Sequence, residues 1–147
     1  MDQERFTPFV LLIERISKNI KRIADKEMEP YGLRSSHVMC MLQLAKTENG
    51  LSSSSLAEAC GVDKAFISRV TTELLEKGFI IKVQDGAKIY KTNFVPTESG
   101  YEIIERMKKI VNGYVCLVDQ NVEKKDIEKF YNVLEEFDKE ISNIVEN

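Results

Sequence analysis

One stretch constrains the fold more than any other, residues 51–80, which read LSSSSLAEACGVDKAFISRVTTELLEKGFI. It holds two short helical patterns of apolar residues, with a single glycine, Gly61, between them. Ser52 and Asp63 are typical N-caps for the two helices, because their side-chain oxygens can accept free amide N–H groups of a first turn. Gly78 is the expected C-terminal stop of the second helix. Two short helices joined by a glycine turn predict a helix-turn-helix.

After Gly78 the pattern changes from the helical period to short extended runs, FIIKVQ and YKTNFV. The letters DGAK between these runs predict a turn, since Asp-Gly is a favoured hairpin pair. Pro96 is expected to end the second strand, and Thr97 to cap a helix over about residues 98–118. A hairpin directly after a helix-turn-helix predicts a wing.

The two ends of the chain read as long helices. Apolar spacing predicts a helix over residues 5–29, which Pro30 ends because the residue before a proline resists the helical conformation. Ser35 or Ser36 can cap a second helix with the sequence HVMCMLQLAK. A last helix is expected over about residues 123–145.

Both terminal helices carry a continuous apolar stripe. In the last helix the spacing is heptad-like, with charged residues around it. The two stripes are Phe9, Leu12, Ile13, Ile16, Ile20 and Ile23, and Ile127, Phe130, Leu134, Phe137, Ile141 and Ile144. They hold more apolar surface than the middle of the chain can cover, which predicts a homodimer. The alternative is that both helices pack on the core of their own chain.

These patterns together predict a mainly α fold, an α+β winged helix. It consists of a winged helix-turn-helix core with long N- and C-terminal dimerisation helices. We expect residues 1–30 and 100–147 to form the helical dimerisation region, and residues 31–99 to form the winged helix-turn-helix DNA-binding region, within one compact chain.

The second helix of the helix-turn-helix has two different faces at 100° per residue. Ile67, Val70, Thr71 and Leu74 share one face, which must pack inward. The opposite face carries Ala65, Arg69, Thr72 and Glu76, flanked by Lys64, Phe66 and Ser68. Small residues allow close approach to a major groove, and an arginine can pair bidentately with guanine. This helix is therefore the candidate recognition helix.

The charge distribution favours the same segment. Residues 62–92 carry a formal charge of +2, although the whole chain carries −3. Lys82, Lys88 and Lys91 lie in or beside the predicted hairpin, and a locally basic segment of an acidic protein can still bind phosphates. The imbalance is modest, and helix-turn-helix patterns also occur in enzymes and in domains that bind proteins. A winged-helix protein-interaction module without DNA binding is therefore the alternative.

The chain resembles the MarR family of bacterial transcription regulators. The matching stretches are YGLRSSHVMCMLQL, residues 51–80 and VPTESGYEI after the wing. Ser68-Arg69 matches the recognition-helix pair of the family. The segment 74–78 matches its Leu-Glu stretch that ends in glycine, and the segment 96–100 matches its Leu-Thr-x-x-Gly.

The resemblance implies an obligate dimer whose two winged lobes enter successive major grooves of a pseudo-palindromic operator in double-stranded DNA, with half-sites ~34 Å apart. It also implies a repressor that a small aromatic or other effector releases. The expected groove contacts are Ala65, Phe66, Ser68, Arg69 and Thr72, with Lys64, Lys88 and Lys91 on phosphates and Ser52 starting the supporting helix.

The wing departs from the family pattern. The family carries Asp-x-Arg at positions that correspond here to Lys88 and Tyr90. The arginine that enters the minor groove is therefore absent, and a lysine lacks its flat, forked donor set. We therefore expect the wing to read the shape of the minor groove more weakly than the family wing does.

The three cysteines, Cys40, Cys60 and Cys116, lie inside apolar helical patterns and show no zinc-type spacing. We interpret them as buried thiols that act as small hydrophobic residues. The alternative is a thiol-based redox-sensing regulator, which would need an exposed cysteine beside a cation. His37 is the only histidine, and with Cys40 it offers too few ligands for zinc.

Several classes of protein are disfavoured by the sequence. No apolar run approaches the roughly 20 residues that span a bilayer, and the polar N-terminus lacks the features of a secretory signal. A cytoplasmic protein with no membrane partner is therefore expected. No Gly-rich phosphate loop, GxSxG or HExxH is present, so we expect neither an enzyme nor a bound cofactor or metal.

Overall fold

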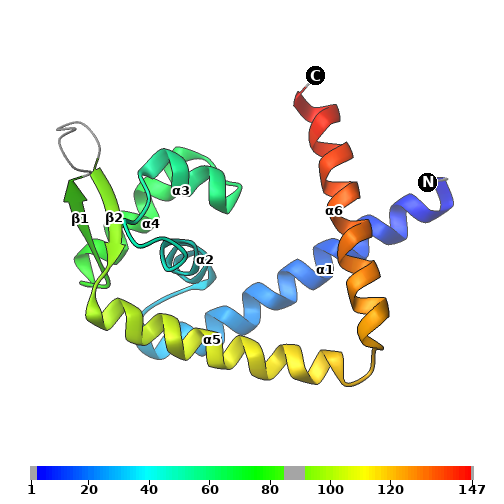
Figure 1. Cartoon of the computed structure of the whole chain (residues 1–147), viewed down its shortest axis with the longest axis horizontal. Coiled ribbons are helices and arrows are strands. Elements are labelled where there is room, and N and C mark those ends of the chain that lie inside the picture. The colour runs from blue at the N-terminus through cyan, green and yellow to red at the C-terminus, as the bar shows by residue number, and fades with distance from the viewer. Residues whose placement is uncertain (1–2, 85–91, 147) are drawn as a thin grey trace. The chain divides into compact units, whose positions relative to one another are not determined.

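The computed structural model describes residues 3–84 and 92–146 (Figure 1). The chain divides into two compact units, the first ending at Glu105 and the second beginning at Arg106. In chain order the elements are α1 (Gln3–Met28), η1 (Glu29–Tyr31), α2 (Ser35–Leu44), α3 (Ser53–Cys60), α4 (Lys64–Glu76), β1 (Ile80–Gln84), β2 (Thr92–Pro96), α5 (Glu98–Asp119) and α6 (Lys124–Glu146). The fold is mainly helical with one two-stranded sheet, as predicted. The predicted division into dimerisation and DNA-binding regions stays a prediction.

The start of α2 corrects the sequence prediction. Neither Ser35 nor Ser36 is the N-cap, because the helix already begins at Ser35 and Arg34 occupies the cap position. The Nδ1 atom of His37 accepts the Arg34 amide N–H at 2.9 Å. The His37 ring thus satisfies the amide N–H of the N-cap residue itself, whereas a capping serine would accept an amide N–H two or three residues further on. Pro30 lies in η1, two residues beyond the end of α1 at Met28.

The helix-turn-helix forms as the sequence predicts. The Ser52 Oγ atom accepts the Ser55 amide N–H at 3.2 Å, which caps α3. Gly61 follows α3 with φ +64°, a left-handed conformation that favours glycine. The Asp63 Oδ1 atom accepts the Phe66 amide N–H at 2.7 Å and caps α4. The short turn at Gly61 therefore joins two helices, each of which has a side-chain N-cap.

The wing is an antiparallel hairpin that lies beside α4 (Figure 1). Its register pairs Ile80 with Pro96, and Gln84 with Thr92. Leu51 adds an isolated bridge to Phe94, with N–H···O distances of 2.9 and 3.2 Å. The predicted turn, including Lys88 and Lys91, lies outside the described residues.

The hydrophobic core of the first unit lies between the helices and the base of the hairpin. Its members come from the end of α1, the turn before α2, the helices α2, α3 and α4, the sheet and the start of α5. Among the most buried side chains are Met28, Leu33, Met41, Leu44, Leu56, Ile67, Leu74, Ile80, Phe94 and Ile104. The four residues predicted to face inward from α4 are all buried. This core fixes the orientation of α4, so its opposite face is free to meet solvent.

The apolar stripes of the terminal helices are not covered within the single chain. Along α1, Leu12, Ile16 and Ile20 are 46–60% exposed. Along α6, Phe130, Ile141 and Ile144 are 48–77% exposed. These side chains are therefore not covered by the unit to which each helix belongs. Within the described residues, no helix combines the length and apolar character that crossing a bilayer requires.

The three thiols differ in burial, which corrects part of the prediction. Cys40 is buried and Cys60 is half-buried, whereas Cys116 is exposed. The prediction of a buried thiol is wrong for Cys116, because the side chains of α5 from Val111 onward are exposed in the single chain.

Candidate nucleic-acid interface

The exposed face of α4 carries most of the predicted DNA contacts. Lys64, Ala65, Ser68, Arg69 and Thr72 are exposed, and Phe66 is partly exposed. At 100° per residue, Ala65 lies one turn before Arg69 and Thr72 one turn after it, both within about 60° of Arg69 around the helix axis. The helix thus brings these predicted residues together on the face opposite its buried stripe.

Arg69 is held over a neighbouring aromatic ring. Its Cζ atom lies 5.2 Å from the centroid of the Phe66 ring, one turn earlier on α4. A cation–π contact at an exposed site contributes about 0.5–1 kcal/mol. The contact restricts the guanidinium on the exposed face, while leaving its N–H donors available to a base edge or a phosphate.

The hydroxyl of Thr72 is already used as a donor. Its Oγ1 atom donates to the Ser68 carbonyl oxygen at 2.7 Å. What Thr72 presents outward is therefore a methyl group and oxygen lone pairs. A methyl can meet a thymine methyl, and an oxygen can accept from an adenine or cytosine amino group.

His37 joins α4 to the start of α2, a contact that sequence reasoning missed. Its ring is 2% exposed. Since Nδ1 accepts from Arg34, the ring proton lies on Nε2, which donates to the Glu73 Oε2 atom at 2.7 Å. This bond holds an acidic side chain of α4 against α2. The only signal in the sequence was a lone histidine in a first turn, and its partner lies 36 residues away.

The remaining predicted contacts lie on elements around α4. The Ser52 hydroxyl contacts the Ser55 hydroxyl at 3.1 Å in addition to capping α3. In the wing, Lys82 is exposed on β1. At the far end of the sheet, Thr97 caps α5 by accepting the Gly100 amide N–H at 3.1 Å and donates to the Gly78 carbonyl oxygen at 2.7 Å. The hairpin is thereby tied to the end of α4.

Within residues 3–84 and 92–146, no cluster of three or more histidine, cysteine, aspartate or glutamate side chains could hold a metal ion. The arrangement instead presents a helix with small, hydroxyl and cationic groups outward, supported by α3 and followed by a hairpin. These features define a winged helix-turn-helix protein.

Comparison with known proteins shows which family part of the chain is similar to. Residues 34–86 match the family model described as the MarR family. The solved structures that resemble the chain include MarR family transcription regulators, so the resemblance seen in the sequence is confirmed. A comparison with curated proteins returned no match.

Three solved structures illustrate the likeness of fold. A MarR protein from Peptoclostridium difficile is 19% identical, with a TM-score of 0.83 over 92% of this chain and 88% of that one. The S. aureus MepR–DNA complex is 19% identical, with a TM-score of 0.79 over 88% and 95%. CouR from Rhodococcus jostii bound to p-coumaroyl-CoA is 18% identical, with a TM-score of 0.79 over 88% and 90%.

Proposed function

We propose that the chain is a sequence-specific, DNA-binding transcription regulator that acts as a dimeric repressor and is released by a small-molecule effector. The observation that carries the proposal is the exposed, cationic face of α4, which lies opposite a fully buried stripe of the same helix. A rigidly packed helix with such a face fits the major groove.

In this proposal the residues of α4 divide between two tasks. Arg69 reads a base edge, with guanine as its best partner. Ala65, Ser68 and Thr72 allow close approach and supply hydroxyl and methyl contacts, beside Phe66. Lys64 binds a phosphate, as do Lys82, Lys88 and Lys91 from the wing. Ser52 starts α3, the helix that supports α4 against the DNA backbone.

Dimerisation is supported by the exposed apolar stripes of α1 and α6. Exposed stripes of this length on both terminal helices would be costly in water, and a second copy of the chain is the simplest partner that covers them. Effector release is proposed by analogy with the fold neighbour CouR, which was solved with a bound ligand.

The alternative is a winged-helix module that binds a protein and no DNA. It is favoured by the low net positive charge and by the absence of the wing arginine at the position of Tyr90. The two functions differ in their response to salt, because only binding to phosphates releases counterions.

The test compares a duplex from the region upstream of the coding sequence with a scrambled duplex of the same length and composition. Affinity is measured by fluorescence anisotropy at several salt concentrations. The proposal expects tighter binding to the upstream duplex and a linear fall of log affinity with log salt. Equal affinity for both duplexes would contradict sequence-specific binding.

A further inference from the structure

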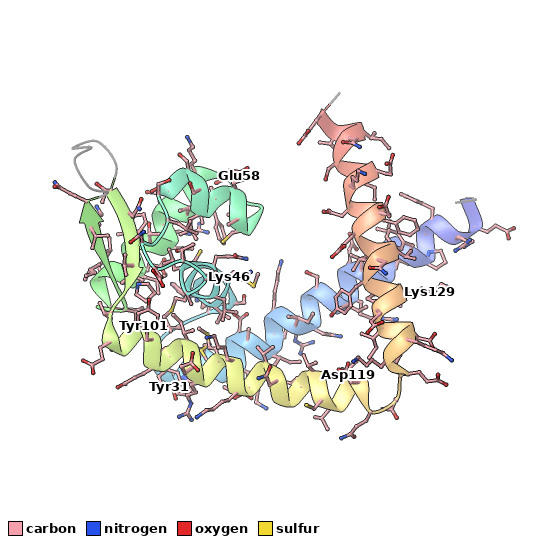
Figure 2. All side chains as sticks on the ribbon, in the orientation of Figure 1. Tyr31, Lys46, Glu58, Tyr101, Asp119 and Lys129 are labelled. Carbon is pink, nitrogen blue, oxygen red and sulfur yellow. The ribbon has the colours of Figure 1, made fainter. Side chains whose placement is uncertain are left out.

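Cys40 and Cys60 form a close pair of thiols. Their Sγ atoms lie 4.0 Å apart, although the residues are 20 positions apart in the sequence. Cys40 lies on α2 and is fully buried, whereas Cys60 is the last residue of α3 and is half-buried. Figure 2 labels Lys46, just beyond α2, and Glu58, on α3, which mark the two helices that carry the pair.

We propose that Cys40 and Cys60 are a redox-active dithiol, which a peroxide oxidises to an intramolecular disulfide, and that this disulfide weakens DNA binding. The site is a modification site within the helix-turn-helix support. Its effect on DNA rests on the proposed function, whereas formation of the disulfide does not.

The reaction uses one peroxide for each pair. The Cys60 thiolate attacks the O–O bond of ROOH, which gives a sulfenic acid on Cys60 and, after protonation, the alcohol ROH. The Cys40 sulfur then attacks the Cys60 sulfur. This step forms the S–S bond, and the sulfenic hydroxyl leaves as water with the Cys40 proton. Two thiols lose two electrons in total, and the peroxide gains them.

The surroundings of the two thiols make Cys60 the first to react. It is the more accessible of the two. Burial raises the pKa of both thiols, but the S–H group of Cys40 and the charge of Lys46 oppose this effect on the pKa of Cys60. Because the thiolate is the reactive form, oxidation is slow at neutral pH and accelerates as pH rises.

In this proposal, closing the disulfide also moves the chain next to α4. A disulfide joins its sulfurs at about 2.05 Å, so the present separation has to shrink by roughly 2 Å. Rotation of the side chains can supply part of this change, and the proposal assigns the rest to a shift of α3 toward α2. Cys60 is followed by Gly61, and the N-cap of α4 is Asp63, only three residues after Cys60. A shift of Cys60 is therefore passed to the first turn of α4.

The experiment uses the full chain in a Cys116→Ser background, which removes the exposed thiol. The reduced protein is treated with hydrogen peroxide at pH 8, and free thiols are titrated. The expected result is a fall from two free thiols to none, with the chain remaining monomeric on a non-reducing denaturing gel. Peptide mass spectrometry should find Cys40 joined to Cys60.

The DNA readout is measured on the same samples. Affinity for the upstream duplex is expected to fall on the order of tenfold after oxidation, within the usual range for coupling between two sites. Dithiothreitol should restore both the thiols and the affinity. In the same background, Cys40→Ala and Cys60→Ser provide matched controls, and peroxide should leave their DNA affinity unchanged.

Three results would overturn the proposal. Both thiols could remain titratable, Cys60 could oxidise without joining Cys40, or the disulfide could form with no change in DNA affinity. A reduced protein that does not prefer its upstream duplex would instead contradict the proposed function. That failure is distinguishable, because thiol titration and peptide mass do not depend on DNA.

Discussion

At the scale of single residues, Arg69 shows how position on a helix decides chemistry. The residue lies on a helix that buries Ile67, Val70 and Leu74, and so the arginine must face outward. Its guanidinium lies over the Phe66 ring, so the side chain is already partly ordered. The arginine therefore loses less conformational entropy when it binds a ligand. An outward, partly ordered guanidinium is well suited to reading a base edge.

Substitution of Arg69 by alanine should separate base reading from phosphate binding. We expect Arg69→Ala to cost about 1–3 kcal/mol of binding to the upstream duplex, with much less effect on a scrambled duplex. Lys64→Ala is the matched control. It should weaken binding to both duplexes alike and lower the slope of log affinity against log salt by about one. Anisotropy titrations on both duplexes measure this. Equal losses on the two duplexes for Arg69→Ala would contradict its role in reading bases.

The buried thiol of Cys40 predicts a specific pH dependence of stability. Burial raises the pKa of this thiol far above its ordinary value, so the folded state keeps the proton while the unfolded state loses it near pH 9. Unfolding is then favoured by ionisation, and the free energy of unfolding should fall above that pH by up to about 1 kcal/mol per pH unit. Urea denaturation at pH 8 and pH 10 measures the fall.

The fall with pH should be smaller in Cys40→Ala, even though that variant starts from a lower stability. Cys116→Ser is the matched control, because its thiol is exposed. It should keep the pH dependence of the parent chain. A pH dependence that is the same in all three proteins would show that other groups cause the fall.

At the scale of elements, one polar side chain links α2 to α4 beside their apolar packing. His37 caps the start of α2 and also binds Glu73 on α4. Both of its ring nitrogens are used, within a residue that is almost fully buried. The helix α4 is therefore linked by a hydrogen bond to α2, a helix outside the helix-turn-helix.

Removal of the His37 ring should destabilise the first unit. His37→Ala leaves the Arg34 amide N–H and the Glu73 carboxylate without this partner, at a cost of about 1–3 kcal/mol. Urea denaturation measures the change. Met39→Ala, an exposed position on the same helix, should stay within about 0.5 kcal/mol of the parent. If both variants lost the same stability, the bridge would have no special role.

Two glycines allow a test of how closely the elements approach. Gly50 has φ +70°, and an added Cβ would lie 2.0 Å from the Phe94 carbonyl oxygen. Gly61 has a similar φ, +64°, but an added Cβ would meet nothing within 4 Å. Gly61→Ala should cost about 1–2 kcal/mol through its backbone conformation alone. Gly50→Ala should cost clearly more, and thermal unfolding of the two variants compares them directly.

The sequence predicted the elements that follow local rules. Ser52 and Asp63 are N-caps because their oxygens reach an amide three residues on, and the inward face of α4 follows from helical spacing. The prediction failed at Ser35, where a buried histidine caps α2 instead. It also could not find the contact of Cys40 with Cys60. Such contacts depend on how helices pack, and no spacing along the chain encodes them.

At the scale of the whole molecule, the chain leaves two apolar stripes exposed, and they belong to its first and last helices. Ile20 of α1 is 60% exposed, and Ile144 of α6 is 77% exposed. A single recognition helix contacts only a few base pairs, so one copy of the chain would bind a half-site weakly. Two copies joined through these stripes would bind two half-sites at a fixed separation.

The proposed dimer is tested by placing a charge in the α6 stripe. Ile141→Glu should shift the protein from dimer to monomer in sedimentation velocity at micromolar concentration, because a carboxylate in an apolar interface stays unpaired. Ser142→Glu adds the same charge one residue further on, outside the stripe, and should remain a dimer. The affinity of the parent chain for DNA should rise strongly when a second half-site is added to the duplex. The affinity of the monomeric variant should hardly change. An Ile141→Glu protein that stays dimeric would exclude this part of the stripe from the interface, and the recognition helices would then have to be held together through other surfaces.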